Sequence, residues 1–412
     1  MMTVVADRDL LSAEMINNPL DYYRDLRNND PVHWAEKQKA WLLTRYEDVS
    51  GAYANPILSS DRVRPLIKRN AASAQPVDSN AAAILEILSS WMVVTDAPAH
   101  TRLRKLANHA FRQQRVAAMG QWIGELVSEL LDEFIESGEQ DFVAGLAYPL
   151  PATVIARMMG APKEHREYFQ RWSDELALVA FGAGGDDRSD RHARALAGVQ
   201  EMQAYVADLI AQRRAEPGED MISALLEGTT RGGDHLSDAE LIAMCALVLF
   251  AGHETTTNLL CNAMVTLSRH PDERTRLQQS PELINGAIEE VLRYEGPIKI
   301  LTRWVTEDTE IRGQTISAGQ RVLLVNQSAN RDPNTFERAD TFDITRPTQP
   351  LHIGFGRGAH ACLGAQLARV EGRVALPMII DRLKDFQVNG DVEWKSILAA
   401  RAVKRLDVTY SI

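Results

Sequence analysis

A long apolar helical segment in the middle of the chain constrains the fold more than any other feature. It runs from Asp238 to about Arg269, which gives about 32 residues, or about 48 Å at 1.5 Å per residue. Ser237 and Glu240 have the spacing of a capping box at its start, and Pro271 stops it at its end. Because its middle is apolar on nearly all sides, the segment must be buried. We therefore expect one long helix through the centre of the protein.

Helical patterns dominate the rest of the chain as well. Alanine, leucine, glutamate and arginine are abundant in segments that predict helices over Asn80–Leu88, Thr101–Ser137, Ala152–Met159, His192–Ala215, Pro281–Tyr294 and Gly364–Leu383. Strand patterns are short, with a hairpin expected at Val32–Trp34 and Ala40–Thr44. A small sheet is expected from Trp304–Val305, Thr309–Ile311, Gln314–Ile316 and Arg321–Asn326, and a minor pairing from Phe386–Asn389 and Arg405–Ser411. The predicted fold class is mainly α with small β-sheets.

Length and composition limit the classes of protein that remain. The 412 residues and 45% hydrophobic content are ample for a large core, and no linker divides the chain, so a single domain over residues 1–412 is expected. The net charge of −11 argues against binding to nucleic acid. Three separate cysteines indicate a reducing compartment, and the first 30 residues contain no apolar run. We therefore expect a cytoplasmic monomer without a membrane anchor.

The middle of the long helix breaks two local rules within AGHETTT, residues 251–257. Gly252 in a helix interior costs about 1 kcal/mol relative to alanine, and a charged Glu254 in a buried stretch must be paired. The Thr255 hydroxyl can compete for the carbonyl of Ala251 and open the helix locally. These residues together predict a groove for a small ligand and waters. The alternative is a helix threonine that bonds only its own backbone.

A second unusual segment is FGRGAHACLG, residues 355–364. It places Cys362 among Gly356, Gly358 and Gly364, immediately before an apolar helical run. Glycines permit a tight turn and a close approach of the backbone to a flat ligand. Backbone N–H groups and a helix N-terminus stabilise a thiolate. Cys362 is therefore a candidate metal ligand or nucleophile, with a buried free cysteine as the alternative.

FGRGAHACLG resembles the haem-binding loop of the cytochrome P-450 superfamily, and the chain resembles its soluble bacterial, ferredoxin-dependent (class I) members. The resemblance implies the cytochrome P-450 fold, with haem b (iron protoporphyrin IX) between the long central helix and the helix after the cysteine loop. Cys362 would be the axial ligand of the haem iron. Phe355, Gly356 and Gly364 would shield and shape this loop.

The resemblance extends to the central helix. AGHETTT is similar to the family's oxygen-binding groove, formed here by Ala251 and Gly252. By resemblance, Thr255 would hydrogen-bond the co-substrate O2, and Glu254 would relay protons from solvent.

Three further residues are expected to be structural. Glu290 and Arg293, three apart on one helical face, match the family's Glu-x-x-Arg motif. Arg346, in TFDITR, completes this set in the family pattern. The resemblance implies that the three hold the cysteine loop in place and do not touch substrate.

The two propionates of haem require cations. By resemblance, His100 and Arg104 in DAPAHTRLRKL, Arg303 after the Glu-x-x-Arg motif, and His360 in the cysteine loop would bind them. Solvated surface charge is the alternative for each residue taken alone. His352 is expected to make a structural hydrogen bond.

The segments that line the substrate pocket in the family nominate an apolar set in this chain. They are the region Phe169–Arg191 and the residues Met92, Val93, Leu247, Val248, Ala251, Ile298, Ile300 and Leu398. Such a lining predicts a lipophilic substrate such as a terpenoid, steroid, fatty acid or macrolide. Lys299 interrupts the apolar run and would either meet an acidic substrate or point to solvent.

The resemblance implies a monooxygenase, an oxidoreductase that inserts one atom of O2 into its substrate by hydroxylation or a related oxidation. No flavin or ferredoxin domain is evident, so electrons are expected from a separate small acidic ferredoxin with its NAD(P)H-dependent reductase. A basic docking face is expected from the arginines that flank the thiolate segments, Arg112, Arg115, Arg357, Arg369 and Arg373. Two alternatives remain, a peroxide-driven haem-thiolate peroxygenase and a non-enzymatic haem-based ligand sensor.

Overall fold

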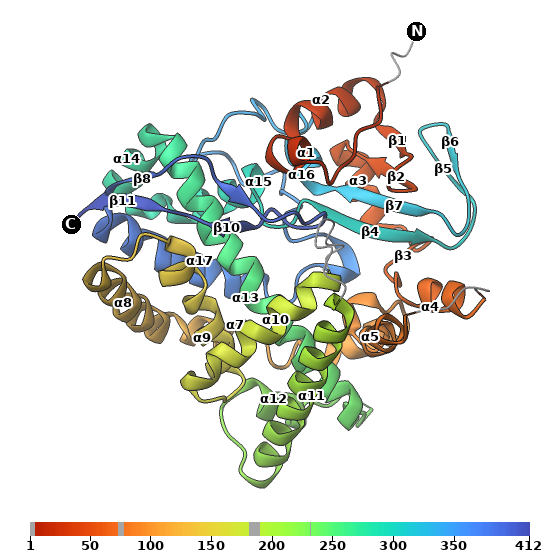
Figure 1. Ribbon diagram of the computed structural model, residues 1–412, viewed down its shortest axis with the longest axis horizontal. Helices are drawn as coiled ribbons and strands as arrows, with labels where there is room; N and C mark the ends of the chain where they lie inside the picture. The colour runs from red at the N-terminus through yellow and green to blue at the C-terminus, as the bar shows by residue number, and fades with distance from the viewer. Residues whose placement is uncertain (1–4, 73–77, 181–189, 231) are drawn as a thin grey trace. The chain divides into compact units, whose positions relative to one another are not determined.

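The computed structural model describes residues 5–72, 78–180, 190–230 and 232–412 (Figure 1). The chain divides into two compact units. The first unit joins Met1–Leu58, Ala117–Leu150 and Thr255–Ile412, and the second joins Ser59–Val116 and Pro151–Glu254. The central helix α13 spans Asp238–Arg269, as the sequence predicts, with the expected capping box between Ser237 and Glu240. This helix passes from the second unit into the first between Glu254 and Thr255.

The main sheet of the first unit has the strand order β1-β2-β7-β4-β3 (Figure 1). Its strands are β1 (Val32–Ala35), β2 (Ala40–Leu43), β7 (Arg321–Val325), β4 (Ile300–Val305) and β3 (Leu58–Ser59). The predicted N-terminal hairpin is present as β1 and β2, and the parallel pairing of β2 with β7 was not predicted. The hairpin β5–β6 (Thr309–Ile311 and Gln314–Ile316) forms a separate two-stranded sheet, so the prediction that it shares one sheet with β4 and β7 was wrong.

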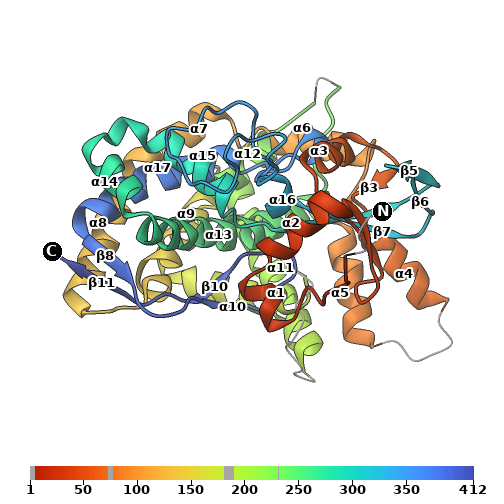
Figure 2. The ribbon, with the colours of Figure 1, turned by 90° about the horizontal axis from the view of Figure 1, so that it is seen from above.

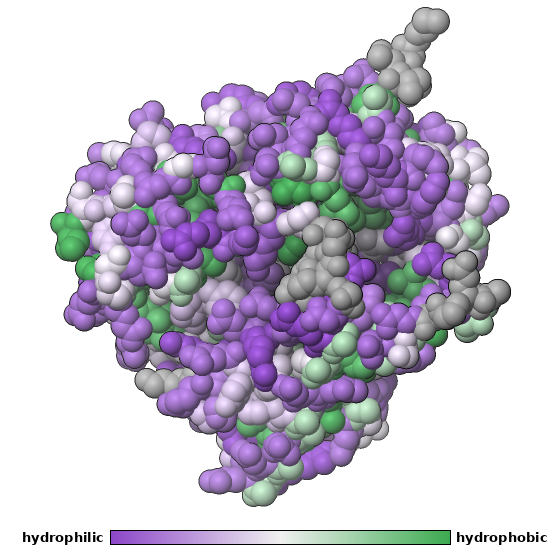
Figure 3. All heavy atoms as spheres, in the orientation of Figure 1, coloured by the Kyte–Doolittle hydropathy of each residue, from purple (hydrophilic) through white to green (hydrophobic). Residues whose placement is uncertain are grey.

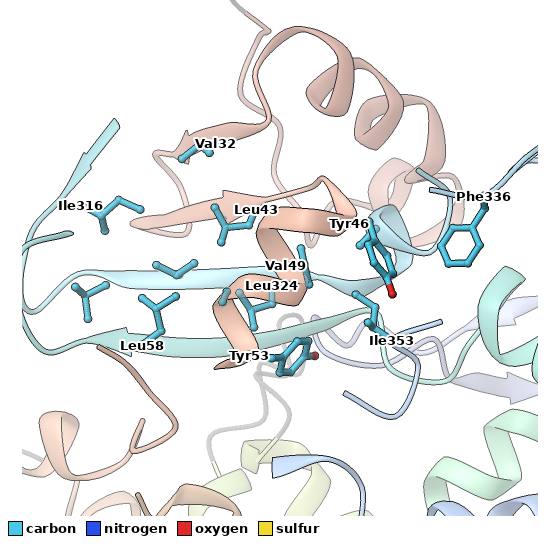
Figure 4. Close-up of a cluster of buried hydrophobic side chains, with 14 of the residues drawn as sticks. Val32, Leu43, Tyr46, Val49, Tyr53, Leu58, Ile316, Leu324, Phe336 and Ile353 are labelled. Atoms are coloured by element: carbon cyan, nitrogen blue, oxygen red, sulfur yellow. The ribbon is translucent and has the colours of Figure 1, made fainter. Parts of the chain in front are cut away.

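The two faces of this sheet bury two hydrophobic clusters. Along β7, Val322 and Leu324 belong to one cluster, and Leu323 and Val325 belong to the other, as the two-residue period of a strand requires. Helix α3 (Tyr46–Ala54) packs its buried side chains onto the first cluster, as Figure 4 shows. This packing fixes α3, which carries a residue of the candidate site.

The helices of the first unit support the segment that follows Cys362. Helix α17 (Ala365–Arg382) contacts α8 (Gly120–Ser137), and Figures 1 and 2 show the two side by side. Gly120 and Gly124 of α8 face Val370 and Val374 of α17, so the two backbones approach closely. The remaining helices are α1 (Ala13–Asn17), α2 (Leu20–Asn29), α14 (Pro271–Gln279), α15 (Ile284–Tyr294), α16 (Asn326–Ala329) and short turns at Val143–Ala147, Pro281–Leu283 and Gly358–His360.

The second unit is helical in its described part. Its elements are α4 (Arg64–Ala71), α5 (Ser79–Ser89), a 3₁₀ turn at Met92–Val94, α6 (Ala99–Ala107), α10 (Arg166–Ala180), α11 (Arg191–Ala215) and α12 (Met221–Glu227). Two further helices, α7 (Gln113–Ala118) and α9 (Pro149–Met158), cross the unit boundaries. The single helix predicted over Thr101–Ser137 was wrong, since that range holds the end of α6, then α7 and α8. The helix is interrupted at Asn108–Arg112, between α6 and α7, and again at Met119, between α7 and α8.

The C-terminal part of the chain forms short antiparallel strand pairs. The predicted minor pairing is present, since β8 (Lys384–Val388) and β11 (Val408–Ser411) are antiparallel. A second pair, β9 (Glu393–Trp394) with β10 (Val403–Arg405), was not predicted.

The face in Figure 3 is covered mainly by hydrophilic residues. Among the described residues, α13 is long and apolar enough to cross a membrane, but 67% of its apolar window is buried, as in a core helix.

Candidate active site

The cysteine loop is a tight turn that leaves the Cys362 side chain exposed. Gly356 and Gly358 have φ angles of 67° and 68°, in the left-handed region that favours glycine. The Cys362 backbone N–H donates to the Phe355 carbonyl oxygen at 2.9 Å, and α17 begins at Ala365. The predicted combination of glycine turn, cysteine and helix start is therefore present.

The other two cysteines are poorly placed to bind a metal as thiolates. Cys245 and Cys261 lie fully buried in α13, where desolvation raises the pKa of the Cys245 thiol to about 12 and that of Cys261 further still. A thiolate is the form that binds a metal. Cys362 is therefore the cysteine of this chain that can reach an added ligand.

Tyr53 on α3 links the cysteine loop to Arg303 on β4. A Cβ on Gly356 would lie 3.4 Å from Tyr53 Cε1, and one on Gly358 would lie 3.1 Å from the Tyr53 carbonyl oxygen. The buried Arg303 guanidinium lies 5.3 Å from the centre of the Tyr53 ring. Figure 4 shows the Tyr53 ring at the edge of the cluster under the sheet. No motif marks Tyr53 in the sequence, so sequence reasoning missed it.

These residues match the donor set that haem requires. Iron binds a thiolate, which Cys362 provides, and a propionate needs a cation, which Arg303 provides within the same unit. His360 is half-buried in the 3₁₀ turn that precedes the cysteine. The chemistry of the first unit thus fits the cofactor that the sequence implies.

The second unit carries the other two predicted cations on α6. His100 is buried and Arg104 is half-buried, one turn apart on the same helix. Burial lowers the pKa of the His100 imidazole, and the positive charge of Arg104 lowers it further. His100 is therefore mainly neutral at pH 7, and would bind a carboxylate as a hydrogen-bond donor.

The middle of α13 is helical throughout, as the sequence predicts for the whole run from Asp238 to Arg269. The helix is continuous through residues 251–255. Ala251 is exposed and Thr255 is half-buried one turn later, whereas Glu254 is buried. The side of α13 that carries Ala251 and Thr255 is thus its accessible side in this region.

Gly252 has a packing role that was not predicted. A Cβ at this position would lie 2.5 Å from Ile155 Cδ1 of α9. The glycine therefore lets α9 approach α13, which corrects the expectation that its missing side chain leaves room for a ligand.

The structural trio predicted from the Glu-x-x-Arg motif is assembled, with Glu290 and Arg293 buried and Arg346 half-buried. Arg293 Nε and Nη2 each donate to a Glu290 carboxylate oxygen at 2.8 Å. Arg346 Nε donates to both Glu290 oxygens at 3.1 Å. Arg293 also donates to the carbonyl oxygens of Asn330, Ala339 and Thr341, so the trio ties α15 to the segment that leads to the cysteine loop.

The predicted substrate residues divide between the units. Leu247, Val248 and Met92 are mostly buried in the second unit, while Val93 and Ala251 are exposed. Residues 181–189 of the predicted pocket region lie outside the described residues.

In the first unit, Ile298 forms an isolated β-bridge with Ala400, which places the residues just before β4 beside the C-terminal turn. Ile300 is 2% exposed in the sheet core, and Leu398 packs on that same cluster. The nomination of Ile300 as a lining residue is corrected, because it fills the core, whereas the half-buried Leu398 stays a candidate. Lys299 does not point to solvent, since it is 3% exposed. Burial and the charge of Arg401 lower its pKa to about 7.

The predicted basic docking face is smaller than expected. Arg369 is engaged by Glu289 on α15, Arg357 donates to Ser50 Oγ, and Arg373 is half-buried. Arg112 and Arg115 are exposed. Engaged guanidinium groups are poorly available to a partner, so Arg369 is removed from the proposed face.

The comparisons with known proteins agree with these observations. The family model named Cytochrome P450 matches residues 59–403. Cytochrome P450 monooxygenase PikC of Streptomyces venezuelae is 35% identical over 98% of this chain and 94% of its own length. Vitamin D(3) 25-hydroxylase of Pseudonocardia autotrophica is 37% identical over 91% of this chain and 88% of its own.

Solved structures give the same assignment. P450BioI, crystallised in complex with hexadec-9Z-enoic acid ligated acyl carrier protein, has a TM-score of 0.87 at 31% identity. The match covers 97% of this chain and 99% of that one. With the cysteine loop, the Glu-x-x-Arg trio and the long central helix in place, the chain belongs to the cytochrome P450 family and is a monooxygenase of the bacterial type.

Proposed function

We propose that this chain binds haem b through Cys362 and uses O2 to oxidise a lipophilic small molecule, with electrons from a separate ferredoxin. The observation that carries the proposal is the exposed Cys362 side chain in a loop packed against Tyr53, which also stacks on Arg303. A thiol for iron and a guanidinium for a propionate thus belong to one unit. The family's general use of haem and O2 supports the cofactor.

Haem, when bound, supplies the activation of O2, which an anionic thiolate ligand favours by pushing electron density toward the O–O bond. The residues of the chain bind, orient and hold protons. Arg303, Arg104 and His360 would bind the propionates, and His100 would donate a hydrogen bond to one of them. Phe355, Gly356 and Gly364 would shape the thiolate side.

Thr255 and Glu254 are the proposed proton-handling residues. The Thr255 hydroxyl lies on the accessible side of α13 and can donate a hydrogen bond to a small ligand. Glu254 is buried, and adjacent helix residues point about 100° apart. Proton transfer between them therefore needs a bridging water or rotation of the carboxylate.

Carbon monoxide difference spectroscopy tests the thiolate assignment. Reduced wild-type protein should show the long-wavelength Soret band of thiolate-bound haem. Cys362→Ser should lose this band, whereas Cys245→Ser, which changes a buried cysteine, should keep it. A Soret band at the ordinary haem position in freshly reduced wild type would contradict the proposal.

The proposed substrate class is apolar. The predicted lining residues Leu247, Val248, Met92 and Ile298 are apolar. One relative is named Vitamin D(3) 25-hydroxylase, and P450BioI was crystallised with a fatty-acyl-carrying protein. A spectral shift screen with fatty acids, steroids, terpenoids and macrolides, followed by product identification, tests this class. Tight binding confined to small polar compounds would contradict it.

Reduction by a ferredoxin is proposed to involve Arg112, an exposed cation before α7. Arg112→Glu should slow reduction by an acidic ferredoxin and weaken its salt dependence. Arg382→Glu, at the end of α17, is the matched control and should reduce at the wild-type rate. Product formation with peroxide alone, at a rate equal to that of the ferredoxin system, would favour the peroxygenase alternative.

We further propose that the two units fold as one domain and that the chain acts as a cytoplasmic monomer. The family model spans parts of both units, which supports a single domain. A single cooperative unfolding transition and a monomeric mass in solution are the expected results. Two separate transitions would contradict the single domain.

A further inference from the structure

An ion pair outside the predicted site lies beside the cysteine loop. Arg369 is on α17, seven residues after Cys362, and Glu289 is on α15. Arg369 Nε donates to Glu289 Oε1 at 2.6 Å, and Nη2 donates to Oε2 at 2.9 Å. Both side chains are 18% exposed, so this is a partly buried, two-point interaction with a fixed geometry.

Phe355 connects this ion pair to the thiolate. The Arg369 guanidinium carbon lies 4.6 Å from the centre of the Phe355 ring. The Phe355 carbonyl accepts the hydrogen bond from the Cys362 backbone N–H at 2.9 Å. Phe355 therefore contacts the Arg369 guanidinium through its ring and the Cys362 N–H through its carbonyl oxygen. These two contacts hold the positive charge in place relative to the cysteine.

His352 fixes the other end of the pair. The Gly354 N–H donates to His352 Nδ1 at 3.0 Å, which places the ring proton on Nε2. Nε2 then donates to Glu289 Oε2 at 3.0 Å. The structural hydrogen bond expected of His352 is thus present, and it anchors the start of the cysteine loop to Glu289.

The pair is ionised at neutral pH. Burial acts to raise the pKa of the Glu289 carboxyl, but hydrogen bonds from Arg369 and His352 outweigh burial and lower the pKa to about 2. Glu289 in turn raises the pKa of Arg369, and the charge on Cys362 adds to this effect. Arg369 is therefore electrostatically coupled to the thiolate as well as to Glu289.

We propose that Arg369, held by Glu289, is a positioning residue that sets the reduction potential of the iron bound to Cys362. The proposal rests on the proposed function, because it requires haem bound at this cysteine. A fixed cation near the thiolate stabilises the reduced state, which carries one more negative charge than the oxidised state. Glu289 offsets part of that stabilisation while it fixes the cation in place.

The two members of the pair should shift the reduction potential in opposite directions. Arg369→Met removes the cation and should make the potential more negative. Glu289→Gln keeps the shape and a hydrogen bond to Arg369 but removes the anion, so it should make the potential more positive. Each change should alter the ferric-to-ferrous equilibrium at least threefold, or about 28 mV at 59 mV per tenfold for one electron.

The experiment is a redox titration of haem-loaded protein, monitored by absorbance. Arg382→Met is the matched control, since Arg382 lies at the far end of α17 and pairs with Asp132, and its potential should equal that of wild type. Arg369→Lys keeps the charge and should lie between wild type and Arg369→Met. If Arg369→Met fails to fold, Glu289→Gln and Arg369→Lys still test the sign.

Shifts of the same sign in Arg369→Met and Glu289→Gln would overturn the proposal, because they would indicate simple disruption of the loop. Unchanged potentials in both variants would overturn it as well. Failure of the proposed function is a different result, since wild-type protein would then lack the thiolate-type carbon monoxide band before any potential is measured.

Discussion

The guanidinium of Arg303 stacks on the ring of Tyr53, 5.3 Å from its centre. The same ring lies against Gly356 of the cysteine loop, and the Tyr53 hydroxyl donates to Asn326 Oδ1 at 2.8 Å. Tyr53 thus orients a cation from β4 and supports the turn before Cys362. An aromatic ring on α3 couples two parts of the site that are far apart in sequence.

Substitutions at Tyr53 should distinguish what the ring contributes to stability and haem content from what the hydroxyl contributes. Tyr53→Ala removes a buried ring and should lower the free energy of unfolding by about 3–5 kcal/mol and reduce haem content. Tyr53→Phe loses one hydrogen bond, so a loss of about 1 kcal/mol with near-normal haem content is expected. Denaturant unfolding and haem titration measure both. An equal loss of haem in the two variants would show that the hydroxyl, not the ring, is decisive.

The buried Glu290 carboxylate should be essential for stability. Glu290→Gln leaves the guanidinium groups of Arg293 and Arg346 without their anion in a buried setting, so a loss of about 3–5 kcal/mol is expected. Asp132→Asn removes the partner of Arg382 on the surface and should change stability by no more than about 1 kcal/mol. Similar losses in the two variants would contradict the assigned difference in burial.

Gly252 should be coupled energetically to Ile155. Gly252→Ala places a Cβ 2.5 Å from Ile155 Cδ1, and overpacking of this kind costs about 1–3 kcal/mol. Ile155→Val removes that atom but keeps Cγ1, 3.0 Å from the added Cβ, so Gly252→Ala should cost less in that background than in wild type. A double-mutant cycle by thermal unfolding measures the coupling. Additive effects would show that the contact does not limit helix packing.

Glu371 should make stability depend on pH. It is fully buried on α17, and neither carboxylate oxygen has a hydrogen-bond partner among the described residues. Burial raises its pKa to about 8, so the folded state holds a proton that the unfolded state releases above its ordinary, lower pKa. This contribution is complete at low pH, falls as pH rises toward 8, and is lost above it.

Glu371→Gln should remove this pH dependence. Urea unfolding between pH 5 and 9 should give a wild-type stability that declines relative to the variant up to about pH 8 and then runs parallel to it. Glu219→Gln, an exposed carboxylate, is the control and should follow the wild-type profile. A constant difference between wild type and Glu371→Gln over the whole range would contradict the raised pKa.

Thr255→Ala should separate oxygen consumption from product formation. Loss of the hydroxyl removes a hydrogen-bond donor on the accessible side of α13, so electrons and O2 should be consumed with release of peroxide. Thr256→Ala changes the next residue, which is buried, and should leave coupling unchanged. Thr255→Ser should restore coupling in part. Full coupling in Thr255→Ala would remove Thr255 from its proposed role.

Local patterns predicted the elements that depend on short spacings. The capping box, the apolar run and Pro271 fixed both ends of α13 without reference to the rest of the chain. Glu290 and Arg293 share a helical face because they are three residues apart, so their ion pair follows from sequence. The hairpin β5–β6 was predicted with its observed bounds because its alternation and turn are local.

The errors arose where a distant segment decides the outcome. Thr101–Ser137 is rich in helix formers, but turns at Asn108–Arg112 and Met119 divide it into three helices. Ile300 was predicted to line the pocket because it lies in an apolar run. In the structure it is buried in the cluster between the sheet and the N-terminal helices. Propensity is local, and tertiary packing overrides it at both places.

The sequence alone determined the chemistry of this protein: a cysteine in a glycine turn before a helix, a long buried helix with a threonine and an acid, and an acid–arginine motif. These are short-range patterns, and each carries its own physical reason. Only the tertiary structure decided that Tyr53 stacks on Arg303, that Gly252 accommodates Ile155, and that Glu289 fixes Arg369 beside the cysteine loop. Such contacts join residues far apart in the chain, where no local spacing encodes which side chains will meet.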